Sequence, residues 1–220
     1  VVGLPWCRDT PKHVAVANLT AKILCRSHNT ALSDVDSAGA KAFTSLRDAA
    51  DIRAAREAEN SQVRRVWPVT KLSVDGSLLE RWFLKTLVNV AVSGGVAGTW
   101  RVSGEPLAST PLAFVKAAFG QERLASPLGL YAVTALNEII ESKDFIEIQT
   151  LLDDSDRLGG ALFTFRGFRF LLNLAPGPVP RAAPMPYGRK LVQSDLTYRL
   201  KRINYAVRGT MSHYIQFKWQ

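Results

Sequence analysis

Residues 7–36, CRDTPKHVAVANLTAKILCRSHNTALSDVD, decide how the first part of this chain is interpreted. Two short apolar segments, 12–17 and 19–24, are expected to be β-strands, and a helical pattern begins after them. The first segment carries His13, and Asn29 stands near the expected start of the helix. The stretch therefore predicts a strand–strand–helix unit with a histidine on its first strand and an asparagine where the helix begins.

The order and spacing of these residues resemble those of bacterial HNH-type proteins, over roughly the first 40 residues of the chain. The segments that carry the resemblance are His13-Val14, Leu24-Cys25-Arg26-Ser27-His28-Asn29 and Leu32-Ser33-Asp34-Val35-Asp36. In that superfamily the strand histidine is the general base, and the helix asparagine is a ligand of a catalytic metal. The resemblance implies that this protein is a metal-dependent endonuclease that hydrolyses phosphodiester bonds in DNA, with His13 as base and Asn29 as a ligand of Mg²⁺ or Mn²⁺.

Phosphodiester hydrolysis needs residues of these types. A neutral imidazole near pH 7 can take the proton of the attacking water. A divalent cation held by oxygen ligands stabilises the charge that develops on the phosphate. Asn29 offers a carbonyl oxygen, and His28 and Asp36 are further candidate ligands of this metal. The sequence departs from the family at Lys12, which stands where an acidic residue usually precedes the histidine.

Two other interpretations of the same stretch stay open. A single histidine on a strand is usually an ordinary structural residue, and an asparagine at a helix start is usually an N-cap. Alternatively, the unit is a degenerate ββα module in a non-catalytic nucleic-acid-binding or scaffold protein. Lys12 separates the functional alternatives, because an active enzyme must find its acidic ligand elsewhere, whereas a binding module can place Lys12 on a phosphate.

The two cysteines suggest Zn²⁺ as a second candidate metal, because many HNH-type proteins hold this unit together with zinc. Cys25-x-x-His28 is half of a typical zinc site, and Cys7 is a candidate third ligand. No fourth ligand stands at the usual spacing. The sequence starts at Val1 and not at Met, so we expect the chain to continue upstream, where a further ligand could lie.

Charge and composition narrow the class of partner. The net charge of +9 over 220 residues favours an anionic partner, with DNA as the first choice. The candidate nucleic-acid contacts are Lys12, Arg26, Arg64 and Arg65. No apolar run approaches the length of a membrane span, and two cysteines with no signal-peptide pattern favour a reducing cytoplasm. A homo-oligomer or a partner subunit stays open.

Hydrophobic periodicity predicts the remaining elements. Helices are expected over about 33–60, 77–91, 111–120 and 128–141, and strands within 63–74, from 145, in a 159–174 hairpin and in the last thirty residues. Residues 176–188 contain five prolines and are expected to form a loop. His213 has no spaced polar partners and is interpreted as structural.

The expected fold class is α+β. A small N-terminal ββα-metal-like module with its long helix is predicted over residues 1–60. A larger mixed helix and antiparallel-sheet region, for binding or dimerisation, is predicted over residues 61–220.

Overall fold

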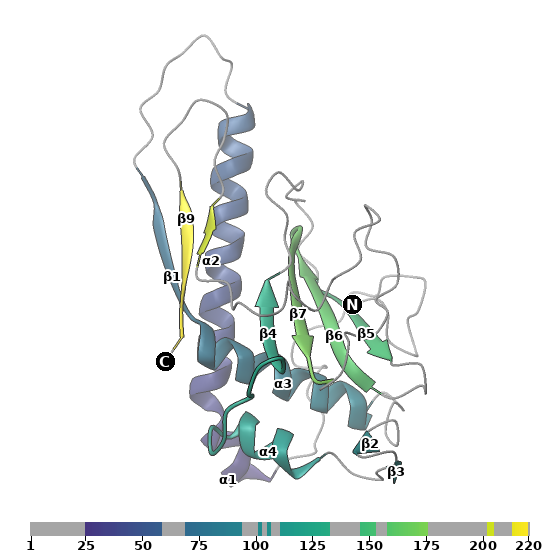
Figure 1. Ribbon diagram of the computed structural model, residues 1–220. Helices are drawn as coiled ribbons and strands as arrows, with labels where there is room; N and C mark the ends of the chain where they lie inside the picture. Colours follow the sequence, from purple (N-terminus) through teal and green to yellow (C-terminus); the bar gives the residue numbers. More distant parts are fainter. Residues whose placement is uncertain are drawn as a thin grey trace.

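The computed structural model describes residues 25–58, 69–93, 101–102, 105–106, 111–132, 146–152, 158–175, 202–204 and 213–219. Within these ranges the chain is a mixed α+β structure, which confirms the expected fold class (Figure 1). The two strands predicted between residues 12 and 24 lie outside the described residues, as does the proline-rich segment 176–188.

The two long helices match their predictions closely. Helix α2 (Ser33–Ala58) follows the short helix α1 (Arg26–Ala31), and it carries Asp34 and Asp36 in its first turn, where acidic residues favour the helix dipole. Helix α3 (Gly76–Ser93) begins after Asp75, whose Oδ1 accepts a hydrogen bond from the Leu78 amide at 2.9 Å. This bond satisfies one of the free amides at the helix start.

The predicted hairpin is confirmed within a four-stranded antiparallel sheet of order β4-β7-β6-β5. Its strands are β4 (Gly129–Ala132), β5 (Ile146–Leu152), β6 (Leu158–Phe165) and β7 (Phe168–Asn173). The turn between β6 and β7 uses Arg166 at φ 47° and Gly167 at φ 82°. Two successive positive φ angles suit the right-handed twist of a tight hairpin.

The helix predicted over residues 128–141 is wrong where the structure describes that segment. Residues 129–132 form strand β4, which pairs antiparallel with β7. Glu80 on α3 also accepts a hydrogen bond from the Leu130 amide, at 2.8 Å. Pairing with a strand some forty residues later therefore outweighs the local helical periodicity, and residues 133–141 lie outside the described part of the chain.

A second sheet joins the middle of the chain to its last described residues. Strands β1 (Lys71–Asp75), β9 (Tyr214–Lys218) and β8 (Arg202–Asn204) form it in that order. Strands β8 and β9 are antiparallel, but β1 and β9 are parallel. The sheet is therefore mixed, where an antiparallel arrangement was expected. Two very short strands, β2 (Arg101–Val102) and β3 (Glu105–Pro106), pair separately.

One hydrophobic core connects these elements. Phe83 on α3 is fully buried, and its ring lies 4.4 Å from that of Phe163 and 5.5 Å from that of Phe170, centroid to centroid. Helix α2 adds Leu46 and Ala49 to the same core, while α4 (Leu112–Ala118) packs against α3. The long helix of the predicted N-terminal region thus shares a core with the predicted second region; the boundary near residue 60 lies outside the described residues and stays a prediction.

Candidate functional site

The central segment of the resemblance, from Cys25 to Asn29, lies at the start of α1. Cys25 is the N-cap residue of this helix, and its Sγ lies 3.1 Å from Nδ1 of His28 and 3.0 Å from Oγ of Ser27. A helical turn brings residues three positions apart onto one face, which explains the Cys25–His28 contact. All three side chains are exposed. The structure therefore presents a thiol and an imidazole side by side to solvent.

This arrangement makes the thiol more acidic. The Ser27 hydroxyl, followed by the His28 amide and the charge of the His28 ring, lowers the pKa of Cys25 from its ordinary value of 9.0 to about 7. Each of these groups stabilises the thiolate by donating a hydrogen bond or by its charge. A substantial fraction of Cys25 is thus thiolate at neutral pH, which is the form that binds metal.

An aromatic contact holds α1 in place. The His28 ring lies edge-on to the ring of Phe119, with 5.6 Å between centroids and 72° between planes. Phe119 is the C-cap residue of α4. Sequence reasoning missed this contact, because no local pattern links two residues about ninety positions apart. The contact places the thiol–imidazole pair beside the end of α4.

Asn29 is not the N-cap of a helix, so that structural interpretation of the residue is wrong. It lies inside α1, and its amide donates to the Cys25 carbonyl at 3.0 Å. Its side chain is exposed, next to His28, and Arg26 is exposed one position after Cys25. The candidate metal ligand Asn29 and the candidate phosphate contact Arg26 therefore lie on the same short helix as the thiol–imidazole pair.

Asp36, the third candidate ligand of the catalytic metal, is engaged elsewhere. Nζ of Lys85 on α3 donates to both of its carboxylate oxygens, at 2.7 and 2.6 Å. This ion pair joins α2 to α3. Among the described residues, no three His, Cys, Asp or Glu side chains form a group that could hold a metal. His13, Lys12, Cys7, Arg64 and Arg65 lie outside the described residues, so their predicted roles stay predictions.

A pocket of about 370 Å³ lies between the start of α3 and the segment after α4, and the sequence did not indicate it. Its lining is charged, but most of these groups already serve the fold. Asp75 caps α3, Glu80 accepts from the Leu130 amide, and Nε of Arg81 donates to the Ala118 carbonyl at 2.9 Å. These charged groups therefore cap α3 or tie it to β4 and α4, and we assign the pocket no ligand.

Comparison with known proteins adds no relative. No protein-family model matches the chain, and neither the curated proteins nor the solved structures include one that is significantly similar to it. In the described part of the chain, no helix is both long enough and apolar enough to cross a membrane.

Proposed function

We propose that the protein is a metal-dependent HNH-like endonuclease that hydrolyses phosphodiester bonds in DNA. The observation that carries the proposal is the contact between Cys25 and His28 at the start of α1, with Asn29 beside them on the same helix. From the resemblance to HNH-type proteins, we expect this helix to follow two strands, the first of which carries the general base His13.

The thiol–imidazole pair fits half of a zinc site. Zinc binds thiolate sulfur at about 2.3 Å and imidazole nitrogen at about 2.0–2.1 Å, which in a tetrahedral site puts the two donor atoms roughly 3.5 Å apart. The observed 3.1 Å between Sγ and Nδ1 needs only a small side-chain rotation to reach that separation. Cys7 is the proposed third ligand. Zinc at this position would fasten the N-terminal strands to α1.

This assignment leaves Asn29 for the catalytic metal. His28 then serves the zinc, and Asp36 keeps its ion pair with Lys85. The catalytic Mg²⁺ or Mn²⁺, when bound, supplies positive charge against the charge that develops on the phosphate. His13 takes the proton from the attacking water, and the exposed Arg26 contacts the DNA backbone. The proposal places the protein in the cytoplasm, where a reducing environment keeps Cys25 free as a thiol.

A nicking assay with metal analysis tests the proposal. Purified protein should convert supercoiled plasmid to the nicked form with Mg²⁺ or Mn²⁺ and not with EDTA. It should also contain about one zinc per chain, which Cys25→Ser should remove. Ser27→Ala is the matched control, because it keeps all three proposed zinc ligands and should keep the zinc. Absence of nicking with every divalent metal would overturn the nuclease proposal in favour of a non-catalytic binding module.

A further inference from the structure

The sheet β1-β9-β8 has one face toward the core and one face outward. On β9, Ile215 and Phe217 are buried in the core, and side chains alternate along a strand. Tyr214, Gln216 and Lys218 therefore lie on the opposite face, where Tyr214 and Gln216 are half-buried and Lys218 is exposed. In Figure 1 this sheet stands at the edge of the molecule alongside the upper part of α2.

Strand β1 extends the outward face. Its residue Lys71 is paired with Tyr214, and Ser73 is paired with Gln216. Lys71 is exposed, and its Nζ lies 5.8 Å from the centre of the Tyr214 ring. The backbone of β8 places Arg202 opposite Gln216 on the other side of β9. An aromatic ring thus lies in the middle strand with a lysine over it.

The charges of this face favour an anion. Lys71 and Lys218 stand at opposite ends of the β1–β9 pair, about 13 Å apart along the strand direction at the usual rise of about 3.3 Å per residue. Among the described residues of β1 and β9, the acid on this face is Asp75, opposite Lys218 in the register. Its Oδ1 accepts from the Leu78 amide, so the Asp75 carboxylate is directed to the start of α3.

We propose that the outward face of β1-β9-β8 binds single-stranded DNA, with phosphates on Lys71 and Lys218 and a base stacked on the Tyr214 ring once the Lys71 ammonium has moved from that ring to its phosphate. Basic residues that follow a backbone beside an aromatic ring are the usual means of binding single strands. Three strands make a face about 10 Å across, and a base can stack on the ring only when it has left a duplex. This proposal goes beyond the proposed cleavage, because it assigns DNA binding to a surface whose contacts with DNA need no metal.

Binding to a fluorescent oligothymidine, measured by anisotropy with the full chain in buffer without added Mg²⁺ or Mn²⁺, tests the proposal. Tyr214→Ala should weaken binding roughly 5- to 150-fold, as expected for the loss of one stacked base, while Tyr214→Phe should bind nearly as tightly as the wild type. Replacing Lys71 and Lys218 together by Gln should reduce the slope of log K against log salt by about 1.4, since each single-strand phosphate contact contributes about 0.7.

The matched control removes the same charge from other elements. Lys41 on α2 and Arg123 after α4 are exposed, and replacing both by Gln should leave affinity and salt slope close to the wild-type values. Circular dichroism spectra should show that each variant is folded before its binding is compared with that of the wild type.

The proposal would be overturned by equal losses in the control, by unchanged binding of Tyr214→Ala, or by no binding at any salt. Dimerisation that Tyr214→Ala abolishes, without DNA binding, would identify the face as a protein interface and would also overturn it. Because the assay contains no added Mg²⁺ or Mn²⁺, its outcome is independent of the nicking assay, and either proposal can fail alone.

Discussion

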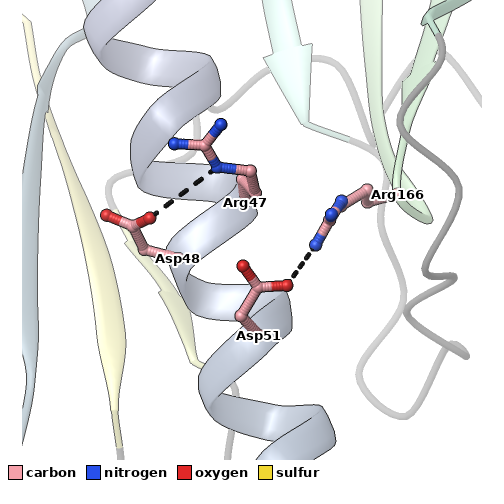
Figure 2. Close-up of polar contacts among 4 residues, drawn as sticks. All are labelled: Arg47, Asp48, Asp51 and Arg166. Atoms are coloured by element: carbon pink, nitrogen blue, oxygen red, sulfur yellow. Dashed lines mark hydrogen bonds and ion pairs between the residues drawn. The ribbon is translucent and has the colours of Figure 1, made fainter.

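Asp51 on α2 holds the β6–β7 hairpin against that helix, so removal of its carboxylate should lower the free energy of unfolding. Arg166, at the tip of the β6–β7 hairpin, forms an ion pair with Asp51 (Figure 2). The Arg166 side chain is 8% exposed, whereas that of Asp51 is 60% exposed. Loss of one partner from a fully buried pair costs about 3–5 kcal/mol. Because water reaches Asp51, we expect Asp51→Ala to cost about 1–3 kcal/mol of unfolding free energy.

The control for this prediction lies nearby on the same helix. Asp48 pairs with Arg47 at 4.0 Å, and both side chains are about half exposed (Figure 2). Asp48→Ala should therefore cost no more than about 0.5 kcal/mol. For a chain of this size, 1 kcal/mol corresponds to about 2–4 °C in melting temperature. Thermal unfolding followed by circular dichroism should show a decrease of roughly 3–9 °C for Asp51→Ala and less than about 2 °C for Asp48→Ala. Equal decreases in melting temperature would refute the reasoning that burial of Arg166 makes its ion pair with Asp51 more stabilising than the exposed pair of Arg47 and Asp48.

Two further predictions concern the thiol and the sheet. In a Cys7→Ser background, alkylation of Cys25 by iodoacetamide should be slow at low pH and rise to a plateau through a midpoint of about 7, because the thiolate is the reactive form. Ser27→Ala removes the largest cause of the lowered pKa and should move that midpoint toward 9.0; an unmoved midpoint would contradict the assigned cause. Gly160→Ala should cost about 3 kcal/mol or more in urea unfolding, because the residue has φ 153° and an added Cβ would lie 2.1 Å from the Leu172 carbonyl oxygen. A cost below about 1 kcal/mol would be inconsistent with the described register of β6 and β7.

Local sequence patterns predicted the two long helices and the hairpin, which are stabilised by residues close to one another in the sequence. The spacing of apolar residues predicted α2 and α3 almost to their ends, and the strand pattern of residues 159–174 predicted the β6–β7 hairpin. Strand β4 was missed, because its stabilising partners, β7 and Glu80, are distant in sequence.

Long-range pairing was beyond the reach of local patterns. The parallel pairing of β1 with β9 joins residues more than 140 positions apart, and no periodicity reports such a partner. The same applies to His213, whose Nδ1 accepts a hydrogen bond from the Thr70 amide at 2.9 Å. This bond supports the structural interpretation of His213, although only the structure identifies its partner.

In the candidate site, too, local contacts were predictable from the sequence and long-range contacts were not. The spacing of Cys25 and His28 predicted their closeness, since one helical turn separates them. The position of Asp36 in sequence made it a candidate metal ligand, but nothing local indicated Lys85, which is 49 residues later on another helix. A candidate ligand inferred from a short stretch can thus be occupied by a partner that the stretch does not contain.

The rate of DNA cleavage by His13→Ala, compared with its affinity for the same DNA, tests the proposed function most directly. With saturating Mn²⁺ and single-turnover conditions, the substitution should slow cleavage by about 10²- to 10⁴-fold, which is the usual contribution of a general base. Affinity for DNA should change by no more than a few-fold, because Arg26 and the sheet face remain. If the wild-type protein cleaves DNA and His13→Ala cleaves it equally fast, the base lies elsewhere and the proposed site is wrong.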